Sequence, residues 1–221
     1  MEFKDWEPVY EQVLHDFGYS RDEDERAARE LALLASDKPQ CDDACLTGMF
    51  GNCATVVAGP ARSGEPITGM LRGTTLSVGI GTSLLLAEGT VPDFVVTDLD
   101  GDVATDIEAN TKGAVLVVHA HGDNIPAIRH FMPSVKGRVV LTTQSTPFGP
   151  VRNFGGFTDG DRAVALAAHF GTHNLRLIGF DLSHPRPKAG SSIETKAKKL
   201  RWAGRLIDRM VTANDMVVEF H

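Results

Sequence analysis

Residues 91–102 read VPDFVVTDLDGD, and the apolar run that begins at residue 94 ends directly in acidic and glycine residues. Apolar runs without alternating polar residues are typical of strands that are covered on both faces, as in a parallel sheet with helical crossovers. The same pattern recurs along the chain. It predicts strands at 54–58, 74–78, 94–97, 114–118, 138–142 and 174–178, with 217–220 as a candidate edge strand.

Stretches compatible with helices separate these strands, at 82–88, 124–131, 159–170 and 193–210. Before the first strand, apolar residues at helical spacing from Trp6 to Phe17 predict an amphipathic helix that ends at Gly18. Ser20 and Glu23 have the spacing of a capping box and predict a second helix that continues to residue 35.

These patterns predict an α/β fold with a mostly parallel, six- or seven-stranded Rossmann-like sheet and helices on both faces. We expect residues 1–50 to form a small N-terminal helical extension and residues 51–221 the α/β catalytic domain. Apolar residues make up 42% of the chain and charged residues 23%, which is ordinary globular usage. There is no apolar run of roughly 18 to 20 residues and no signal-peptide layout, so we expect a cytoplasmic protein without a membrane partner.

The three cysteines, Cys41, Cys45 and Cys53, are an odd number close together in the sequence. This arrangement suits neither a disulfide framework nor a zinc knuckle. We therefore expect them to be small, unreactive hydrophobic residues.

The charge of the chain is unevenly distributed. The formal net charge is −7, yet residues 186–209 carry eight Lys or Arg residues against Glu194 and Asp208, which leaves −13 elsewhere. A nucleic-acid-binding protein would spread basic charge more widely. The pattern favours a phosphate-bearing small ligand and no nucleic acid.

Ligands of open parallel sheets bind beyond the carboxyl ends of the strands. There, Asp98, Asp100 and Asp102 follow a predicted strand at i, i+2 and i+4. If the extended conformation continues, all three carboxylates lie on the same side and suit Mg²⁺. A solvated acidic turn and a calcium loop are the alternatives, but the twelfth position of such a loop is Ala109 and not Glu.

Further polar residues follow the next predicted strands. The segment HAHGDN at 119–124 offers two histidines for a metal, a substrate ring or a proton, and Asp123 or Asn124 as a helix cap. In NFGGFTDGDR at 153–162, Thr158 or Asp159 is a candidate cap. Phe154 is a candidate to stack on a flat heterocycle, whereas Phe157 is expected to lie in the core.

Two segments are candidates for phosphate contacts. The turn GPARSG at 59–64 allows close approach of the backbone, but it matches neither a Walker loop nor the dinucleotide fingerprint, and a plain turn is an equal alternative. Lys199 and Arg201 lie on the basic final helix, whose face either is solvated or contacts a triphosphate.

Taken together, the segments resemble the archaeal type of 6-hydroxymethyl-7,8-dihydropterin pyrophosphokinase, a family distantly similar to thiamin pyrophosphokinases. The segments that carry the resemblance are VPDFVVTDLDGD (91–102), VVHAHGDN (117–124), TTQ (142–144), NFGGFTDGDRAV (153–164), LIGFD (177–181) and KKLRWAGRLI (198–207). One segment departs from the pattern. Where that family usually has an Ala-Asp-Gly-Ala-like segment, this chain has VGIG at 78–81, which lacks the aspartate but keeps Gly79 and Gly81 for close backbone approach.

The resemblance implies transfer of the terminal diphosphate of ATP to 6-hydroxymethyl-7,8-dihydropterin with release of AMP, in tetrahydrofolate or methanopterin biosynthesis. ATP would be the co-substrate, Mg²⁺ the cofactor and the reduced pterin the acceptor. The hypothesis has Asp98 and Asp100 bind Mg²⁺ directly, with Asp102, Asp123 or Asp161 completing the shell. Catalysis would rest on Asp98, Asp100 and Asp123. The residues expected to contact the pterin are His119, His121, Asn124, Gln144, Asn153, Phe154, Thr158 and Asp159. Those expected to contact the nucleotide are Gly59, Pro60, Gly79, Gly81, Lys199 and Arg201.

Three other functions stay open at this point. A metal-dependent phosphoester hydrolase would use the histidines and aspartates with two metals. A nucleotide-binding module would carry out no chemistry, and a sugar-nucleotide transferase would prefer a nucleotide sugar to ATP. The assembly, monomer or homo-oligomer, is not determined by the sequence.

Overall fold

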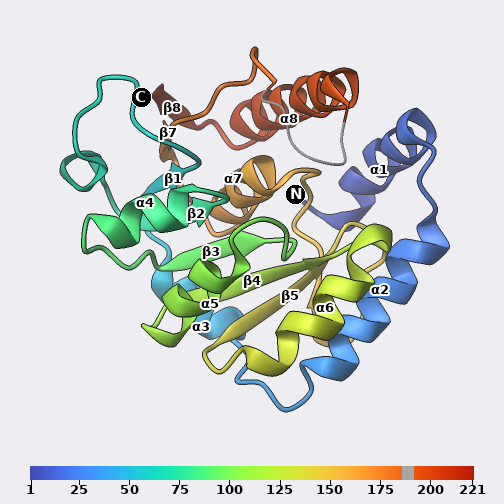
Figure 1. Cartoon of the computed structure of the whole chain (residues 1–221). Coiled ribbons are helices and arrows are strands. Elements are labelled where there is room, and N and C mark those ends of the chain that lie inside the picture. Colours follow the sequence, from blue (N-terminus) through green and yellow to red (C-terminus); the bar gives the residue numbers. More distant parts are fainter. Residues whose placement is uncertain (186–191) are drawn as a thin grey trace.

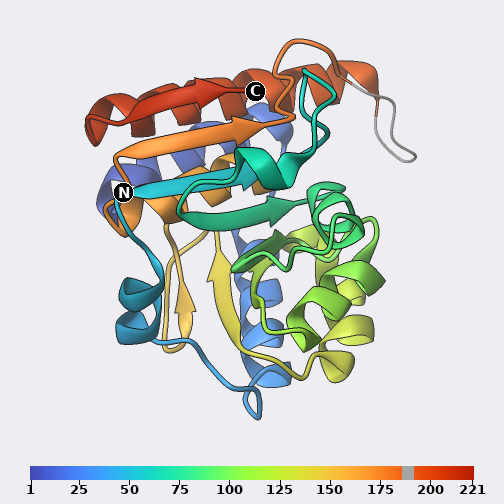
Figure 2. The ribbon, with the colours of Figure 1, turned by 90° about the vertical axis from the view of Figure 1, so that its left-hand side faces the viewer.

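The computed structural model describes residues 1–185 and 192–221, so Arg186 and Lys188 of the basic segment lie outside the described residues. One parallel sheet of eight strands forms the centre of the molecule, in the order β6-β5-β4-β3-β2-β1-β7-β8 (Figures 1 and 2). The strands are β1 (Cys53–Val57), β2 (Thr74–Val78), β3 (Phe94–Thr97), β4 (Val115–Ala120), β5 (Val139–Thr143), β6 (Val151–Arg152), β7 (Asn174–Ile178) and β8 (Val217–Phe220).

Helices cover both faces of this sheet (Figure 1). On one face, α1, α3, α7 and α8 share a hydrophobic core with the sheet. On the other face, α2, α4, α5 and α6 pack against the sheet. The α-helices are α1 (Phe3–Phe17), α2 (Arg21–Leu34), α3 (Asp43–Met49), α4 (Gly81–Ala87), α5 (Val103–Thr111), α6 (Ile125–Phe131), α7 (Asp159–His169) and α8 (Ile193–Ala213), and the 3₁₀ helices are η1 (Ile67–Met70), η2 (Gly122–Asn124) and η3 (Met132–Ser134).

The position of β3 between two hydrophobic cores explains why its first three residues are apolar. Phe94 and Val96 belong to the core on the α7 and α8 side, whereas Val95 belongs to the core on the α2 side. All three side chains are at most 2% exposed. Because alternate residues of a strand face opposite sides, a sheet with helices on both faces needs apolar residues at every position. Burial of each such side chain contributes about 1.5–3 kcal/mol.

The path of the chain reverses beside β1. From β1 to β6 each strand is added on the same side, and β7 is then added on the opposite side of β1. The loops that follow β1 and β7 touch here, since a Cβ at Gly179 would lie 2.3 Å from the carbonyl carbon of Gly59. In open parallel sheets the crevice at such a reversal is the usual place for a ligand.

The structure confirms the predicted α/β class and the largely parallel sheet. The strands expected at 74–78, 94–97, 174–178 and 217–220 have those bounds. The predicted strand count of six or seven was too low because β6 has only two residues. Helices α3 and α5 were not predicted; both are short, at seven and nine residues.

Two local predictions were wrong. The side chain of Ser20 makes no capping hydrogen bond at the start of α2, so the expected capping box is absent. Cys41 and Cys45 form a disulfide and are not free hydrophobic residues. Asp42 caps α3 between them, and the helical turn brings their Cα atoms to 5.5 Å, a distance that a disulfide spans. Cys53 is free.

Helices α1 and α2 share their packing with the sheet. Trp6 and Tyr10 of α1 are fully buried in the core on the α7 side, and Leu31 of α2 is fully buried in the core on the opposite side. Within residues 1–185 and 192–221, there is no helix with the length and apolarity that a membrane span requires.

The contact between Gly59 and Gly179 can be tested against a matched glycine. Gly171 and Gly179 both have positive φ, but a Cβ at Gly171 meets nothing within 4 Å. Gly171→Ala therefore carries only the conformational cost and should lower the free energy of unfolding by about 1 kcal/mol. Gly179→Ala adds a steric conflict and should lower it by about 3 kcal/mol or more. Urea unfolding curves measure both values, and equal losses would contradict tight packing of the two loops.

Candidate active site

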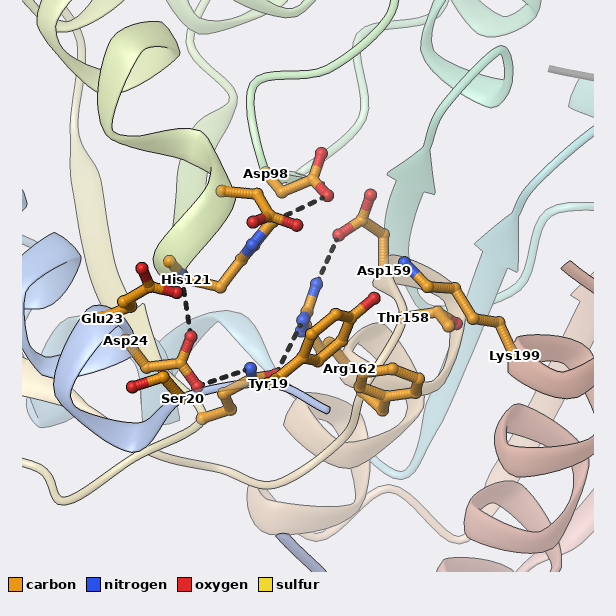
Figure 3. A pocket seen from close by; sticks show the side chains of 14 residues that line it. Tyr19, Ser20, Glu23, Asp24, Asp98, His121, Thr158, Asp159, Arg162 and Lys199 are labelled. Carbon is orange, nitrogen blue, oxygen red and sulfur yellow. Dashed lines mark hydrogen bonds and ion pairs between the residues drawn. The ribbon is translucent and has the colours of Figure 1, made fainter. Parts of the chain in front are cut away.

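A polar cavity of about 140 Å³ lies at the carboxyl ends of β3, β4 and β5 (Figure 3). Its wall also includes the first residues of α2 and α7 and one lysine of α8. Five carboxylates line it, against the cationic side chains of Arg162 and Lys199. The carboxylates are those of Glu23, Asp24, Asp98, Asp123 and Asp159.

The end of β3 places Asp98 in this cavity. Leu99 adopts a left-handed conformation with φ of 63°, and its side chain is buried in the core. The extended conformation therefore stops at β3, and the expected placement of three aspartates on one side by strand alternation was wrong. Asp102 instead caps α5 by accepting hydrogen bonds from the backbone and hydroxyl of Thr105. Asp100 is exposed and is not among the described residues that line the cavity.

The loop after β4 is held against Asp98. Nε2 of His121 lies 3.4 Å from Oδ2 of Asp98. The amide of Asn124 donates to the carbonyl oxygens of Asp98 and His119, at 2.8 and 2.7 Å, and accepts from the backbone of His121. Asn124 thus joins the ends of β3 and β4, while His121 and Asp123 line the cavity.

His119 is buried and does not line the cavity. Its Nδ1 is 3.0 Å from Oγ1 of Thr142, which itself donates to the carbonyl of Val118. The ring therefore donates from Nδ1, and Nε2 is left as an acceptor. Burial, aided by the charge of Arg162, lowers the pKa of His119 well below its usual value, so the ring is neutral.

Arg162 connects the end of β5 with the start of α7. Its guanidinium donates to Asp159 at 3.0 Å and to the side chain of Gln144 at 3.5 Å. Burial and the charge of Asp98 raise the pKa of Asp159, whereas Arg162 opposes that change. Figure 3 shows Asp98, Asp159, Arg162 and Lys199 converging on the same space.

Three other predicted site residues have structural contacts. Asp161 is fully buried and caps α7, where it accepts from the backbone of Phe157 and from Thr158. Asn153 donates to the carbonyl of Ser145 and accepts from Gly155. Phe154 is buried in the core and packs against His169 and Phe170.

The N-terminal helices supply a wall of the cavity that the sequence analysis did not identify. Tyr19, Ser20, Glu23 and Asp24 line it. Asp24 is only 3% exposed and accepts three hydrogen bonds. The donors are the backbone of Gly122 at 2.8 Å, the hydroxyl of Tyr10 at 2.7 Å and the side chain of Gln144 at 2.8 Å.

A signal for Asp24 was present in the sequence. Ala27, Ala28 and Leu31 follow it at i+3, i+4 and i+7, so an acidic residue occupies the apolar stripe of α2. A carboxylate at such a position is buried and needs donors from elsewhere in the fold. Burial of Tyr10 itself, followed by its hydrogen bond to Asp24 and the charge of Asp24, raises the pKa of Tyr10, which keeps the phenol protonated as a donor.

A second, larger cavity of about 420 Å³ adjoins the first and shares Thr158 and Lys199 with it. It lies beyond the ends of β1, β2 and β7, under α8. Ala58 and Gly179, the neighbours of the predicted nucleotide-binding turn, form part of its lining. Arg201 is exposed and is not among the described residues that line either cavity.

The predicted metal ligands are not gathered into one cluster. In the part of the chain that the structure describes, no group of three or more His, Cys, Asp or Glu side chains is arranged to hold a metal ion. Asp98 is in the cavity, whereas Asp102 and Asp161 cap helices.

Comparisons with known proteins identify relatives along the whole chain. Residues 72–187 match the family described as 6-hydroxymethylpterin diphosphokinase MptE-like. The 6-hydroxymethyl-7,8-dihydropterin pyrophosphokinase of Methanothermobacter thermautotrophicus is 38% identical, over 99% of this chain and 99% of the relative. The protein of the same name from Pyrococcus furiosus is 38% identical over 94% of each chain. A solved thiamine pyrophosphokinase from Bacillus subtilis is 15% identical, with a TM-score of 0.43 over 76% of this chain and 59% of that chain.

Removing the acceptor capacity of Asp24 should destabilise the fold more than removing a neighbouring charge. In Asp24→Asn, an NH₂ group faces at least one of the three donors, and we expect a loss of about 2 kcal/mol in the free energy of unfolding. Glu23→Gln, at an exposed position in the same cavity wall, should change it by less than about 0.5 kcal/mol. Urea unfolding of both variants tests the difference. Equal effects would show that the buried hydrogen bonds of Asp24 do not stabilise the protein.

Proposed function

The chain belongs to the MptE-like 6-hydroxymethylpterin diphosphokinase family, and from this we propose that it transfers the terminal diphosphate of ATP to 6-hydroxymethyl-7,8-dihydropterin, releasing AMP, in tetrahydrofolate or methanopterin biosynthesis. The observation that carries the proposal is the convergence in one cavity of five of the segments that resemble the family. These segments contribute Asp98, His121, Gln144, Asp159 and Lys199. The relatives are similar over nearly their full length, so the comparison includes the whole catalytic unit.

The first cavity suits the pterin. A reduced pterin is flat and carries amide and amino donors and acceptors along one edge, so its burial requires paired polar groups. Gln144, Arg162 and Asp159 supply a donor and acceptors in this cavity. The rings of Tyr19 and Phe157 supply flat apolar surface beside them.

Magnesium is the cation that fits the oxygen-rich end of β3 in this proposal. Hard divalent cations prefer carboxylate oxygens, and Mg²⁺ is usually held by one or two carboxylates together with substrate phosphates. Asp98 would bind the ion in the cavity, and Asp123 would support it from the next loop. When bound, the ion would neutralise charge on the phosphate oxygens.

The protein's own side chains would then position the reactants. The hydroxymethyl oxygen attacks the β-phosphorus of ATP and gives up its proton, the new O–P bond forms, and the bond from the β-phosphorus to the bridging oxygen of AMP breaks so that AMP leaves. Such a transfer depends on alignment and charge neutralisation more than on covalent chemistry. The Arg162–Asp159 pair would orient the pterin. Lys199, which lines both cavities, would hold the phosphates between them.

The alternatives have less support. A two-metal hydrolase requires several ligands around adjacent ions, and the described residues contain no group of three or more candidate ligands. A binding module without chemistry would not explain similarity to named pyrophosphokinases along almost the entire chain.

Product analysis distinguishes these functions directly. The protein incubated with ATP, Mg²⁺ and 6-hydroxymethyl-7,8-dihydropterin should form AMP and a pyrophosphorylated pterin in equal amounts, measured by mass spectrometry. A hydrolase would release phosphate without the pterin, and a binding module would leave ATP unchanged. Either outcome would refute the proposed function.

Substitution of Asp98 should separate catalysis from stability. Asp98→Asn should lower turnover at least about a hundredfold with an unchanged melting temperature, because a direct metal contact is lost. Asp102→Asn is the matched control, since Asn caps a helix about as well as Asp. That variant should keep turnover within a few-fold. Full activity of Asp98→Asn at limiting Mg²⁺ would eliminate the metal role of Asp98.

A further inference from the structure

The second cavity has features that the transfer of a diphosphate does not itself explain. Its volume is about 420 Å³, against about 140 Å³ for the first cavity. Apolar side chains dominate its lining, among them Val78, Ile80, Phe180 and Leu200. Cavities of several hundred Å³ with apolar walls and a few polar groups are typical small-molecule sites.

We propose that this second cavity binds the adenosine part of ATP, with the triphosphate directed past Lys199 into the first cavity. The inference rests on the proposed function for the identity of the nucleotide. Its location rests on the fold, because the cavity lies at the reversal between β1 and β7, where open parallel sheets bind their ligands.

Lys199 makes the two cavities continuous. It lines both of them, and its ammonium lies 5.9 Å from the ring centre of Tyr19 and 5.6 Å from that of Phe157, two walls of the first cavity. Lys196, one helical turn earlier on α8, lines the second cavity. A ligand that extends from the second cavity to the first therefore passes these cationic side chains, as a polyphosphate chain requires.

The chemistry of the two walls fixes which ligand occupies which cavity. The pterin edge would leave its donors and acceptors unpaired against Val78, Phe180 and Leu200, which is unfavourable. The lining of the first cavity, which includes Gln144, Asp159 and Arg162, offers donors and acceptors for that edge. Pterin in the first cavity avoids this cost and leaves the second cavity for adenosine.

Ile80 gives independent support. It belongs to the VGIG segment, at the start of α4, and its side chain is 51% exposed at the edge of the second cavity. Ile80 continues the apolar lining formed by Val78 and Leu200, and contiguous apolar surface of this kind is typical of a ligand-binding groove. A nucleoside in the cavity would bury this side chain, which gives the segment a binding role without an aspartate.

Two substitutions of the cavity wall test the proposal by direct binding. Ile80→Ser and Leu200→Ala each remove apolar surface, and the Kd of α,β-methylene-ATP, measured by calorimetry, should rise roughly tenfold. The Kd of 6-hydroxymethyl-7,8-dihydropterin should change less than about twofold. Leu33→Ser is the matched control, because Leu33 is a 69% exposed side chain on α2 that is outside the described lining of both cavities, and neither Kd should change.

Inorganic tripolyphosphate isolates the contribution of the nucleoside. The wild-type protein should bind α,β-methylene-ATP more tightly than tripolyphosphate, and Ile80→Ser should reduce that difference while leaving the tripolyphosphate Kd unchanged. A rise in the pterin Kd alone would reverse the assignment of the cavities. Unchanged Kd values for all ligands would exclude the second cavity as a binding site.

These results remain distinct from a failure of the proposed function. The analogue binds without turnover. If the wall substitutions raise its Kd but no pyrophosphorylated pterin forms, the adenosine site is supported and the transferase function is refuted. If the pyrophosphorylated pterin forms but neither wall substitution changes the Kd of the analogue, the transferase function is supported and the adenosine site is refuted.

Discussion

The common direction of the strands is the constraint on which the rest of the molecule depends. Because all eight strands are parallel, the loops that follow them lie along one edge of the sheet. Residues as distant in sequence as Asp98, Gln144 and Asp159 therefore meet in one cavity. The reversal beside β1 opens a second cavity on the same edge, so two substrates can be held next to each other.

Most of the fold could be predicted from the sequence, because the strands of a sheet that is buried on both faces are apolar runs that are easy to identify. Strand β3 and its neighbours follow from that rule. The two-residue β6 and the seven-residue α3 are too short to produce a periodic pattern. The disulfide between Cys41 and Cys45 depends on the local helical turn, which cysteine spacing alone does not specify.

The candidate site was less predictable because its contacts are long-range. The segments that contain Asp98, His121 and Asp159 could be identified, since each follows a strand or begins a helix. The hydrogen bond between Asp24 and Gln144 could not be predicted from the sequence, because the two residues are 120 positions apart and only the fold brings them together. The left-handed turn at Leu99 also invalidated the inference from strand alternation, because one residue with positive φ redirects every side chain after it.

A diphosphotransferase must favour an alcohol over water, which can attack the same phosphorus, so the reaction needs a site from which water is largely excluded. Tyr19 and Asp24 form part of the wall of the first cavity. Two hydrogen bonds of Asp24 tie this wall to the loops after β4 and β5, and the third joins it to Tyr10 of α1. If this wall moved away, the buried carboxylate of Asp24 and its three donors would lose their hydrogen bonds. Leaving buried polar groups unpaired costs free energy, so these bonds hold the wall in place. The N-terminal helices are thus part of the structure that forms the cavity.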